Sequence, residues 1–115
     1  MNDRQTIGKL GENRALEFLE QQGFHLVTRN YRHGHGEIDL ILSKEELLVF
    51  VEVKTRTSRR FGFPEEHLSW QQISKIQATA EAFLAAHRWT NNIRFDVMAV
   101  ILSPRASVRH FKDVY

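Results

Sequence analysis

The residues best suited to chemistry lie in the stretch EIDLILSKEELLVFVEVKTR, residues 37–56. Two strongly apolar runs carry an acid pair, Glu37 and Asp39, at one end and Glu52 with Lys54 at the other. Carboxylates brought together repel each other and lose hydration, which is costly unless positive charge lies between them. A divalent cation supplies such charge, so this stretch predicts a metal site built from carboxylates.

The sequence contains no cysteine, so the available ligands are carboxylates, backbone carbonyls and water. These oxygen ligands suit Mg²⁺ or Mn²⁺, and water bound to either ion is a ready nucleophile. Lys54 could lower the pKa of that water, position it, or hold a phosphate oxygen. Hydrolysis of a phosphodiester gathers negative charge in its transition state, so these residues favour nuclease chemistry.

These residues require a hairpin of two strands, 37–42 and 47–56, joined by a polar turn at SKEE. Side chains alternate between the two faces of a strand, so each strand should have one apolar face. The apolar faces would carry Ile38, Leu40 and Leu42 on the first strand and Val49, Val51 and Val53 on the second. If both face the same core layer, the other layer receives Glu37, Asp39, Glu52 and Lys54.

The register of this hairpin has two alternatives. Pairing Asp39 with Glu52 leaves Glu45 and Glu46 as a two-residue turn, for which they are poor residues. A shifted or bulged register is the other alternative.

An amphipathic helix is predicted from about Thr6 to Gln22, with Gly23 placed to end it. At about 100° per residue, Glu12 lies on or beside the inward stripe, where a carboxylate needs a partner. The structural alternative is an acid in the first part of the helix that the helix dipole favours. The stripe itself comprises Gly8, Ala15, Leu16 and Leu19.

A second helix, WQQISKIQATAEAFLAAH, follows Ser69, which has capping-box spacing to Gln72. Its predicted inward stripe comprises Trp70, Ile73, Gln77, Ala80, Phe83, Leu84 and His87. A polar amide in that stripe needs partners, so Gln77 either reaches the acidic cluster or a nucleotide, or is a satisfied core glutamine.

The remaining segments complete a single domain over residues 1–115. Strands are expected at FHLVTRNYR, at IRFDVMAVIL and, on an edge, at VRHFKDVY, with turns at HGHG and SPRAS and a basic loop, TRTSRRFGFPEEH. The order α-β-β-β-α-β-β predicts an α/β domain with a mixed central sheet flanked by helices.

Composition limits the class of protein. With 115 residues, 42% hydrophobic and 26% charged, the chain is an ordinary globular domain. The absence of cysteine fits a reducing compartment. The polar N-terminal residues and the lack of a long apolar run lead us to expect neither a signal peptide nor a membrane span. We therefore expect a cytoplasmic protein with no membrane partner.

The net charge of +2 is too small to indicate a nucleic-acid partner, but the cations are clustered. Arg29, Arg32, Lys54, Arg56, Arg59 and Arg60 lie near the acidic stretch in the sequence. The run TRTSRR either tracks a phosphate backbone or is a solvated loop, and salt-dependent binding would distinguish the two.

Several of these residues have simpler structural interpretations. Glu52 and Lys54 alone could be an ion pair on a solvated strand face, and Glu37 an exposed residue at a strand start. Asp96 is better explained by pairing with Arg94 or another neighbour than by catalysis. The pair His33 and His35 resembles a transition-metal site, but a glycine-rich turn without a third ligand favours a loop.

The pattern of Asp39 followed by Glu52-Val53-Lys54 resembles the PD-(D/E)XK nuclease superfamily, the fold of many restriction enzymes and of archaeal Holliday-junction resolvases. Together, GENRALEFL, GEIDLI and VFVEVKTR are similar to the YraN family of small bacterial proteins, described as predicted endonucleases. The resemblance covers nearly the whole chain. In one departure, Ile38 stands where a proline would precede the motif aspartate.

The resemblance implies a restriction-endonuclease-like core and a divalent-metal-dependent endonuclease acting on DNA. Asp39 and Glu52 would hold the metal, Lys54 would assist the nucleophilic water, and Glu12 would complete the site. We further expect Arg32, Arg56, Arg59 and Arg60 to bind the backbone, with Glu37 and Gln77 supporting the acids. A homodimer would suit branched or junction DNA. The rival is an inactive nuclease-fold protein that binds DNA or acts as an adaptor.

Overall fold

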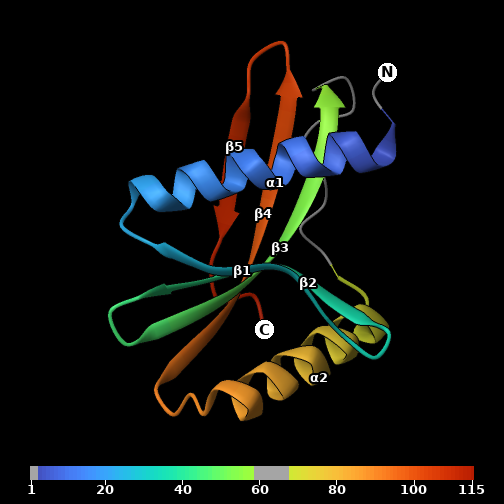
Figure 1. The fold of residues 1–115 in the computed structure, drawn as a ribbon. Helices are drawn as coiled ribbons and strands as arrows, with labels where there is room; N and C mark the ends of the chain where they lie inside the picture. The colour runs from blue at the N-terminus through green and yellow to red at the C-terminus, as the bar shows by residue number, and fades with distance from the viewer. Residues whose placement is uncertain (1–2, 59–67) are drawn as a thin grey trace.

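The computed structural model describes residues 3–58 and 68–115. In these ranges a five-stranded sheet carries one helix on each face (Figure 1). The elements are α1 (Arg4–Gln21), β1 (His25–His33), β2 (Gly36–Lys44), β3 (Leu47–Ser58), α2 (Trp70–His87), β4 (Asn92–Ser103) and β5 (Ser107–Phe111). Their order confirms the predicted α-β-β-β-α-β-β arrangement.

The strands lie in the sheet in chain order, β1-β2-β3-β4-β5. The β3–β4 pair is parallel because α2 carries the chain back between them, and the other pairs are antiparallel. This mixed sheet between two helices is consistent with a restriction-endonuclease-like core, so the predicted fold class is confirmed.

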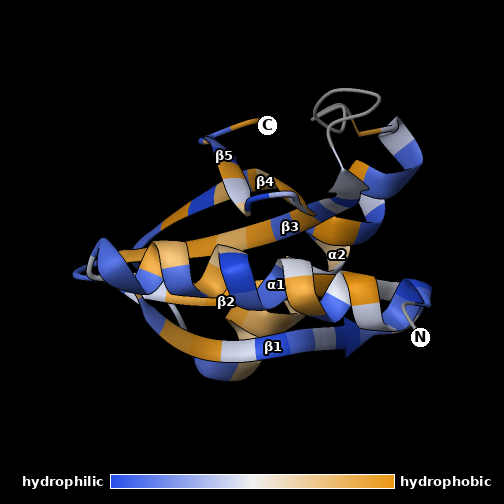
Figure 2. Cartoon of the chain, turned by 90° about the horizontal axis from the view of Figure 1, so that it is seen from above, coloured by the Kyte–Doolittle hydropathy of each residue, from blue (hydrophilic) through white to orange (hydrophobic). Residues whose placement is uncertain are grey.

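Each face of the sheet has its own apolar core (Figure 2). On the α1 side, Ala15 and Leu19 of the helix pack on β2, β3 and β4. On the α2 side, Ile76, Ala80 and Phe83 pack on the opposite face of the same strands. The central strands are therefore covered on both faces, which explains their nearly continuous apolar sequences.

The β2–β3 hairpin has the register that lines Asp39 up with Glu52. Its paired residues run from Lys44 with Leu47 to Leu40 with Val51, so Glu45 and Glu46 form a two-residue turn. Glu45 takes the left-handed conformation (φ 56°) that such turns use. The alternative of a shifted hairpin is wrong, and the irregularity lies instead in β1, between Leu26 and Thr28.

The prediction that Ile38 shares a face with Leu40 and Leu42 is wrong. Ile38 packs in the α2-side core with Ile41, whereas Leu40 and Leu42 pack on the α1 side. The alternation breaks at Asp39, next to the point where β2 stops pairing with β3. On β1, the residue between the partners of Leu40 and Ile38 is Asn30, whose φ of 50° also departs from a regular strand.

A glycine brings α1 close to the sheet. A Cβ on Gly11 would overlap the Thr55 side chain of β3, so only glycine allows this approach. The same helix carries Glu12 as its next residue. The close contact therefore places Glu12, which is half-buried, next to the sheet.

The buried stripe of α2 differs from the predicted one. It comprises Ile76, Thr79, Ala80 and Phe83. Trp70 is 83% exposed and Gln77 is exposed as well, so the predicted inward positions of both are wrong. The Ser69–Gln72 capping box is present as predicted. Neither helix in the described ranges is long and apolar enough to cross a membrane.

The last strand is shorter than predicted and ends at Phe111. Asp113 has a left-handed φ of 55°, which departs from strand geometry just after the paired part of β5. This segment is held by Asp113 N–H donating to Asp96 Oδ1 (3.0 Å) and Val114 N–H donating to the Phe95 carbonyl (2.9 Å).

Candidate functional site

The centre of the site is the point where β2 and β3 separate. Their pairing ends at Leu40 and Val51; beyond it β2 continues beside β1 and β3 beside β4 (Figure 1). Asp39 is the first β2 residue past this point, and its Oδ2 accepts a 2.7 Å hydrogen bond from the Val53 N–H. The side chain thus satisfies a β3 amide that β2 no longer reaches, and the carboxylate is fixed between the two strands.

Glu52 is half-buried beside Asp39. It borders Ile38, Phe50 and Ile76, an apolar environment for a carboxyl group. Burial, the hydrogen bond and charge of Asp39, and the charge of Glu37 raise the pKa of Glu52 to about 10, and the charge of Lys54 only partly opposes them. At neutral pH Glu52 therefore keeps its proton.

Glu12 approaches the same acids from α1, with its side chain 14% exposed. Burial and the Asp39 charge raise the pKa of Glu12, while Asn30 and Arg29 act in the opposite direction. The Asn30 amide lies 3.3 Å from both Glu12 oxygens, and Arg29 Nη2 lies 3.5 Å from one. Glu12 thus lies within electrostatic range of Asp39 but is bound by β1.

Asn30 organises the site and was missed by the sequence analysis. Its side-chain amide also donates to Glu37 (3.0 Å), so one side chain joins two acids from different elements. Its left-handed φ of 50° is a conformation that asparagine tolerates better than most residues. The available signal was an asparagine inside a strand-like segment, where asparagine is depleted.

The sequence indicated Arg29 only as one of several basic residues near the acidic stretch, without a specific role. Its Nη2 donates to Asn13 Oδ1 (2.8 Å), which ties β1 to α1 beside Glu12. Its Nε is buried without a hydrogen-bond partner. Arg29 is therefore a fixed cation beside the acids rather than a mobile surface residue.

The donor set fits a hard divalent cation in part. Asp39 and Glu52 are in contact, offer only oxygen, and repel each other when both are ionised. Within residues 3–58 and 68–115, however, no three His, Cys, Asp or Glu side chains form a ready-made metal site. Asp39 and Glu52 are thus the pair best placed to hold an ion, and two further acids lie within electrostatic range, Glu12 of Asp39 and Glu37 of Glu52.

The other residues predicted for the site differ in their burial and in their contacts with the acids. Lys54 is half-buried beside Glu52, and Glu37 accepts from Asn30 and pairs with the exposed Arg32 at 3.4 Å. Arg56, Gln77, His33 and His35 are exposed, and Arg59 and Arg60 lie outside the described residues.

Two clefts border α1 near the acids. One, of about 520 Å³, is lined by Glu12, Asn30 and Glu37 together with the cations Arg4, Lys9 and Arg32. The other, of about 420 Å³, lies between α1 and β3 and is lined by Arg4 and Arg56. Positive side chains therefore surround the acidic cluster on both sides of α1.

Comparison with known proteins identifies the family of this chain. The model of the uncharacterised protein family UPF0102 matches residues 11–100, which include Glu12, Asp39, Glu52 and Lys54. A UPF0102 protein of Dictyoglomus turgidum is 42% identical over 97% of this chain and 95% of its own length. A UPF0102 protein of Cytophaga hutchinsonii is 47% identical over 81% of this chain and 82% of its own length. One of Bacteroides thetaiotaomicron is 39% identical over 100% of this chain and 96% of its own length.

Proposed function

This chain belongs to the uncharacterised protein family UPF0102, the YraN family that its motifs resemble, and we propose that it is a divalent-metal-dependent endonuclease hydrolysing phosphodiester bonds of DNA. The observation that carries the proposal is the contact between the half-buried side chains of Asp39 and Glu52. A pKa of about 10 for Glu52 marks an arrangement that disfavours two ionised carboxylates. Such strongly shifted groups are found at functional sites more often than elsewhere.

Asp39 and Glu52 would hold Mg²⁺ or Mn²⁺, with Glu12 as the third acid beside them. When bound, such an ion supplies positive charge that polarises the phosphodiester and lowers the pKa of water. The oxygen-only donor set and the absence of cysteine favour these hard ions over zinc.

The remaining groups of the site would orient the acids and the substrate. The Val53 N–H holds Asp39, and the Asn30 amide holds both Glu12 and Glu37. Lys54, an ammonium group beside Glu52, would position the attacking water or hold a non-bridging phosphate oxygen. Ile38, Phe50 and Ile76 border Glu52 and restrict the access of bulk water.

Nucleic acid is the substrate class that the charges favour. Arg4, Lys9, Arg32 and Arg56 line the clefts around an acidic centre, a pattern suited to a phosphate backbone approaching a metal. Arg59 and Arg60 follow in the same basic run and belong to the proposed interface. A homodimer acting on branched or junction DNA is the form of the proposal drawn from the superfamily.

The rival is a catalytically inactive nuclease-fold protein that binds DNA or acts as an adaptor. One observation favours it: Glu12 is already bound by Arg29 and Asn30, and no ready-made site of three acids exists in the described ranges. In that case the acid pair would be structural.

Cleavage assays separate the two functions. Purified protein is incubated with linear, flapped and four-way DNA in Mg²⁺ or Mn²⁺, alongside Asp39→Asn, Lys54→Gln and, as a surface control, Glu20→Gln. We expect cleavage by the native protein and by Glu20→Gln but by neither of the other variants. DNA binding without cleavage, unchanged by Asp39→Asn, would support the rival.

A further inference from the structure

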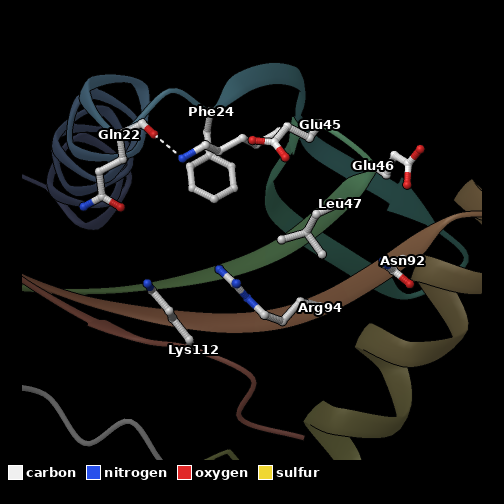
Figure 3. Close-up of a pocket in the computed structure, with 9 residues that line it drawn as sticks. Gln22, Phe24, Glu45, Glu46, Leu47, Asn92, Arg94 and Lys112 are labelled. Carbon is white, nitrogen blue, oxygen red and sulfur yellow. Dashed lines mark hydrogen bonds between the residues drawn. The ribbon is translucent and has the colours of Figure 1, made fainter.

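A third pocket, larger than the two clefts near the acids, lies beyond the C-terminal end of α1. The helix ends at Gln21 and leaves uncovered the corner between the β2–β3 turn and the start of β4. The pocket has a volume of about 600 Å³ (Figure 3). From Leu47 on its wall, β3 runs five residues to Glu52, roughly 17 Å at the usual rise per residue. The proposed nuclease site does not use this pocket.

One cation of the pocket is held rigidly. Arg94 donates from Nε to Asp96 Oδ1 (2.9 Å) and from Nη2 to Oδ2 (2.8 Å), a bidentate pair with an aspartate that is fully buried. His110 Nε2 (2.7 Å) and the Asp113 N–H (3.0 Å) also bind this aspartate. The pair uses only Nε and Nη2, so the third guanidinium nitrogen, Nη1, is not engaged by Asp96. This network fixes a guanidinium group at the pocket wall.

Two lysines add to this cation. Lys112 is exposed and precedes Asp113, so the same aspartate anchors the segment that carries it. Lys44 donates to the Gln22 carbonyl (2.8 Å) and lies over the Phe24 ring. Figure 3 shows the nitrogen ends of Arg94 and Lys112 directed into the pocket, toward the end of α1. Three cations from separate segments thus converge there.

The rest of the lining limits the ligand. Phe24 and Leu47 provide apolar surface, and Gln22 and Asn92 add side-chain amides. Glu45 and Glu46 lie on the same lining, and the Asp113 charge acts on Arg94. These acids would repel an extended polyanion, whereas a single anionic group could still reach the cationic end.

We propose that this pocket binds a small molecule carrying one oxyanion, a phosphate or carboxylate group, attached to an apolar or planar part. The oxyanion would contact Arg94 and Lys112, and the apolar part would lie against Phe24 and Leu47. A guanidinium held in place by a buried network suits such a group because little side-chain freedom remains to be lost. This binding site is independent of the proposed nuclease activity.

The test is an amide-resolved NMR titration of the full chain at constant ionic strength. The probes are inorganic phosphate, acetate, adenosine monophosphate and a short single-stranded oligonucleotide. Lys112→Gln is compared with Lys75→Gln, a matched exposed lysine on α2. We expect the small anions to shift the signals of Asn92, Arg94 and Lys112, with adenosine monophosphate binding more tightly because it adds a planar base.

Lys112→Gln should weaken binding of adenosine monophosphate about fivefold, as expected for loss of one exposed charged contact, and Lys75→Gln should not. Equal thermal stability of the two variants shows that folding is not the cause. Shifts spread over all basic surface residues, affinity unchanged by Lys112→Gln, or a response to the oligonucleotide alone would each overturn the proposal.

Discussion

The Asp39 carboxylate accepts a 2.7 Å hydrogen bond from the Val53 N–H at the point where β2 and β3 stop pairing. Strand separation leaves a β3 amide without a backbone partner, and the aspartate side chain takes its place. Because Glu52 directly precedes Val53, the same contact holds the two acids together. The acid pair is therefore a consequence of how the sheet divides.

Glu52→Gln should stabilise the metal-free protein. The folded protein holds a proton on Glu52 up to a pKa of about 10, against an ordinary value of 4.5, so unfolding releases a proton between these values. Stability of the native protein should fall as pH rises through this window, by at most about 1.4 kcal/mol per pH unit. Glutamine keeps a donor for Asp39 without titrating, so its profile should be flatter.

Urea unfolding at several pH values checks this expectation, with Glu20→Gln as the control for an exposed acid. The glutamine variant at position 52 should be the more stable protein near neutral pH by about 2 kcal/mol. Parallel profiles for the native protein and this variant would mean that Glu52 is ionised in the folded protein.

Two glycines of α1 should respond oppositely to alanine. Gly11→Ala should destabilise the protein by about 1 to 3 kcal/mol because its Cβ overlaps Thr55. Gly8→Ala should stabilise it by about 0.5 to 1 kcal/mol, since a Cβ there meets nothing and alanine favours the helix. Chemical denaturation of both variants provides the measurement, and effects of the same sign would refute the close packing of α1.

The two functions of Asn30 can be separated by Asn30→Gly and Asn30→Ala. Both remove the amide that joins Glu12 and Glu37, so both should weaken Mn²⁺ binding about tenfold. Alanine is strained at φ 50° and glycine is not, so the Asn30→Ala protein should be less stable than the Asn30→Gly protein by about 1 kcal/mol. Calorimetry and thermal unfolding measure the two effects, and native Mn²⁺ affinity in the glycine variant would remove Asn30 from the site.

Asp96→Asn should destabilise the protein by about 3 kcal/mol, because it disrupts a buried ion pair. Burial alone would raise the pKa of Asp96, but hydrogen bonds from His110, Arg94 and the Asp113 amide outweigh it and lower the pKa. The stabilisation is therefore present above the ordinary pKa of an aspartate and is lost as pH falls through the lowered value.

Acid titration of stability tests this expectation. The native protein should lose more stability between neutral and acidic pH than Asp96→Asn does. Asp113→Asn is the matched control, since it keeps the backbone N–H that binds Asp96. If Asp96→Asn loses as much stability at acidic pH as the native protein, then other acids cause the loss.

The strands of the hairpin carrying the acids could be predicted because their signals are local: alternating apolar residues defined both. The register stayed open between the pairing of Asp39 with Glu52 and a shifted alternative, and the structure has the first. The pairing of Asp96 with Arg94, favoured from the sequence, is also confirmed. In each case neighbouring residues along one or two strands determine the outcome.

The missed features depend on packing between distant segments. Ile38 changes face because β2 leaves β3, and the sequence of β2 alone does not show where that happens. Thr79 rather than Gln77 faces the sheet because α2 packs closely on Gly36, where any Cβ would overlap the threonine. The sequence did not indicate the role of Asn30, because its partners are acids from two other elements and its left-handed backbone conformation depends on the fold around it.

A metal site at Asp39 and Glu52 is tested most directly by calorimetric titration of the purified protein with Mn²⁺, compared with Asp39→Asn and with the surface control Glu20→Gln. We expect saturable binding with proton release, since the ion displaces the proton on Glu52. Asp39→Asn should lose this binding and the control should keep it. Absence of saturable binding to the native protein, or equal binding by Asp39→Asn, would contradict a metal site at these acids.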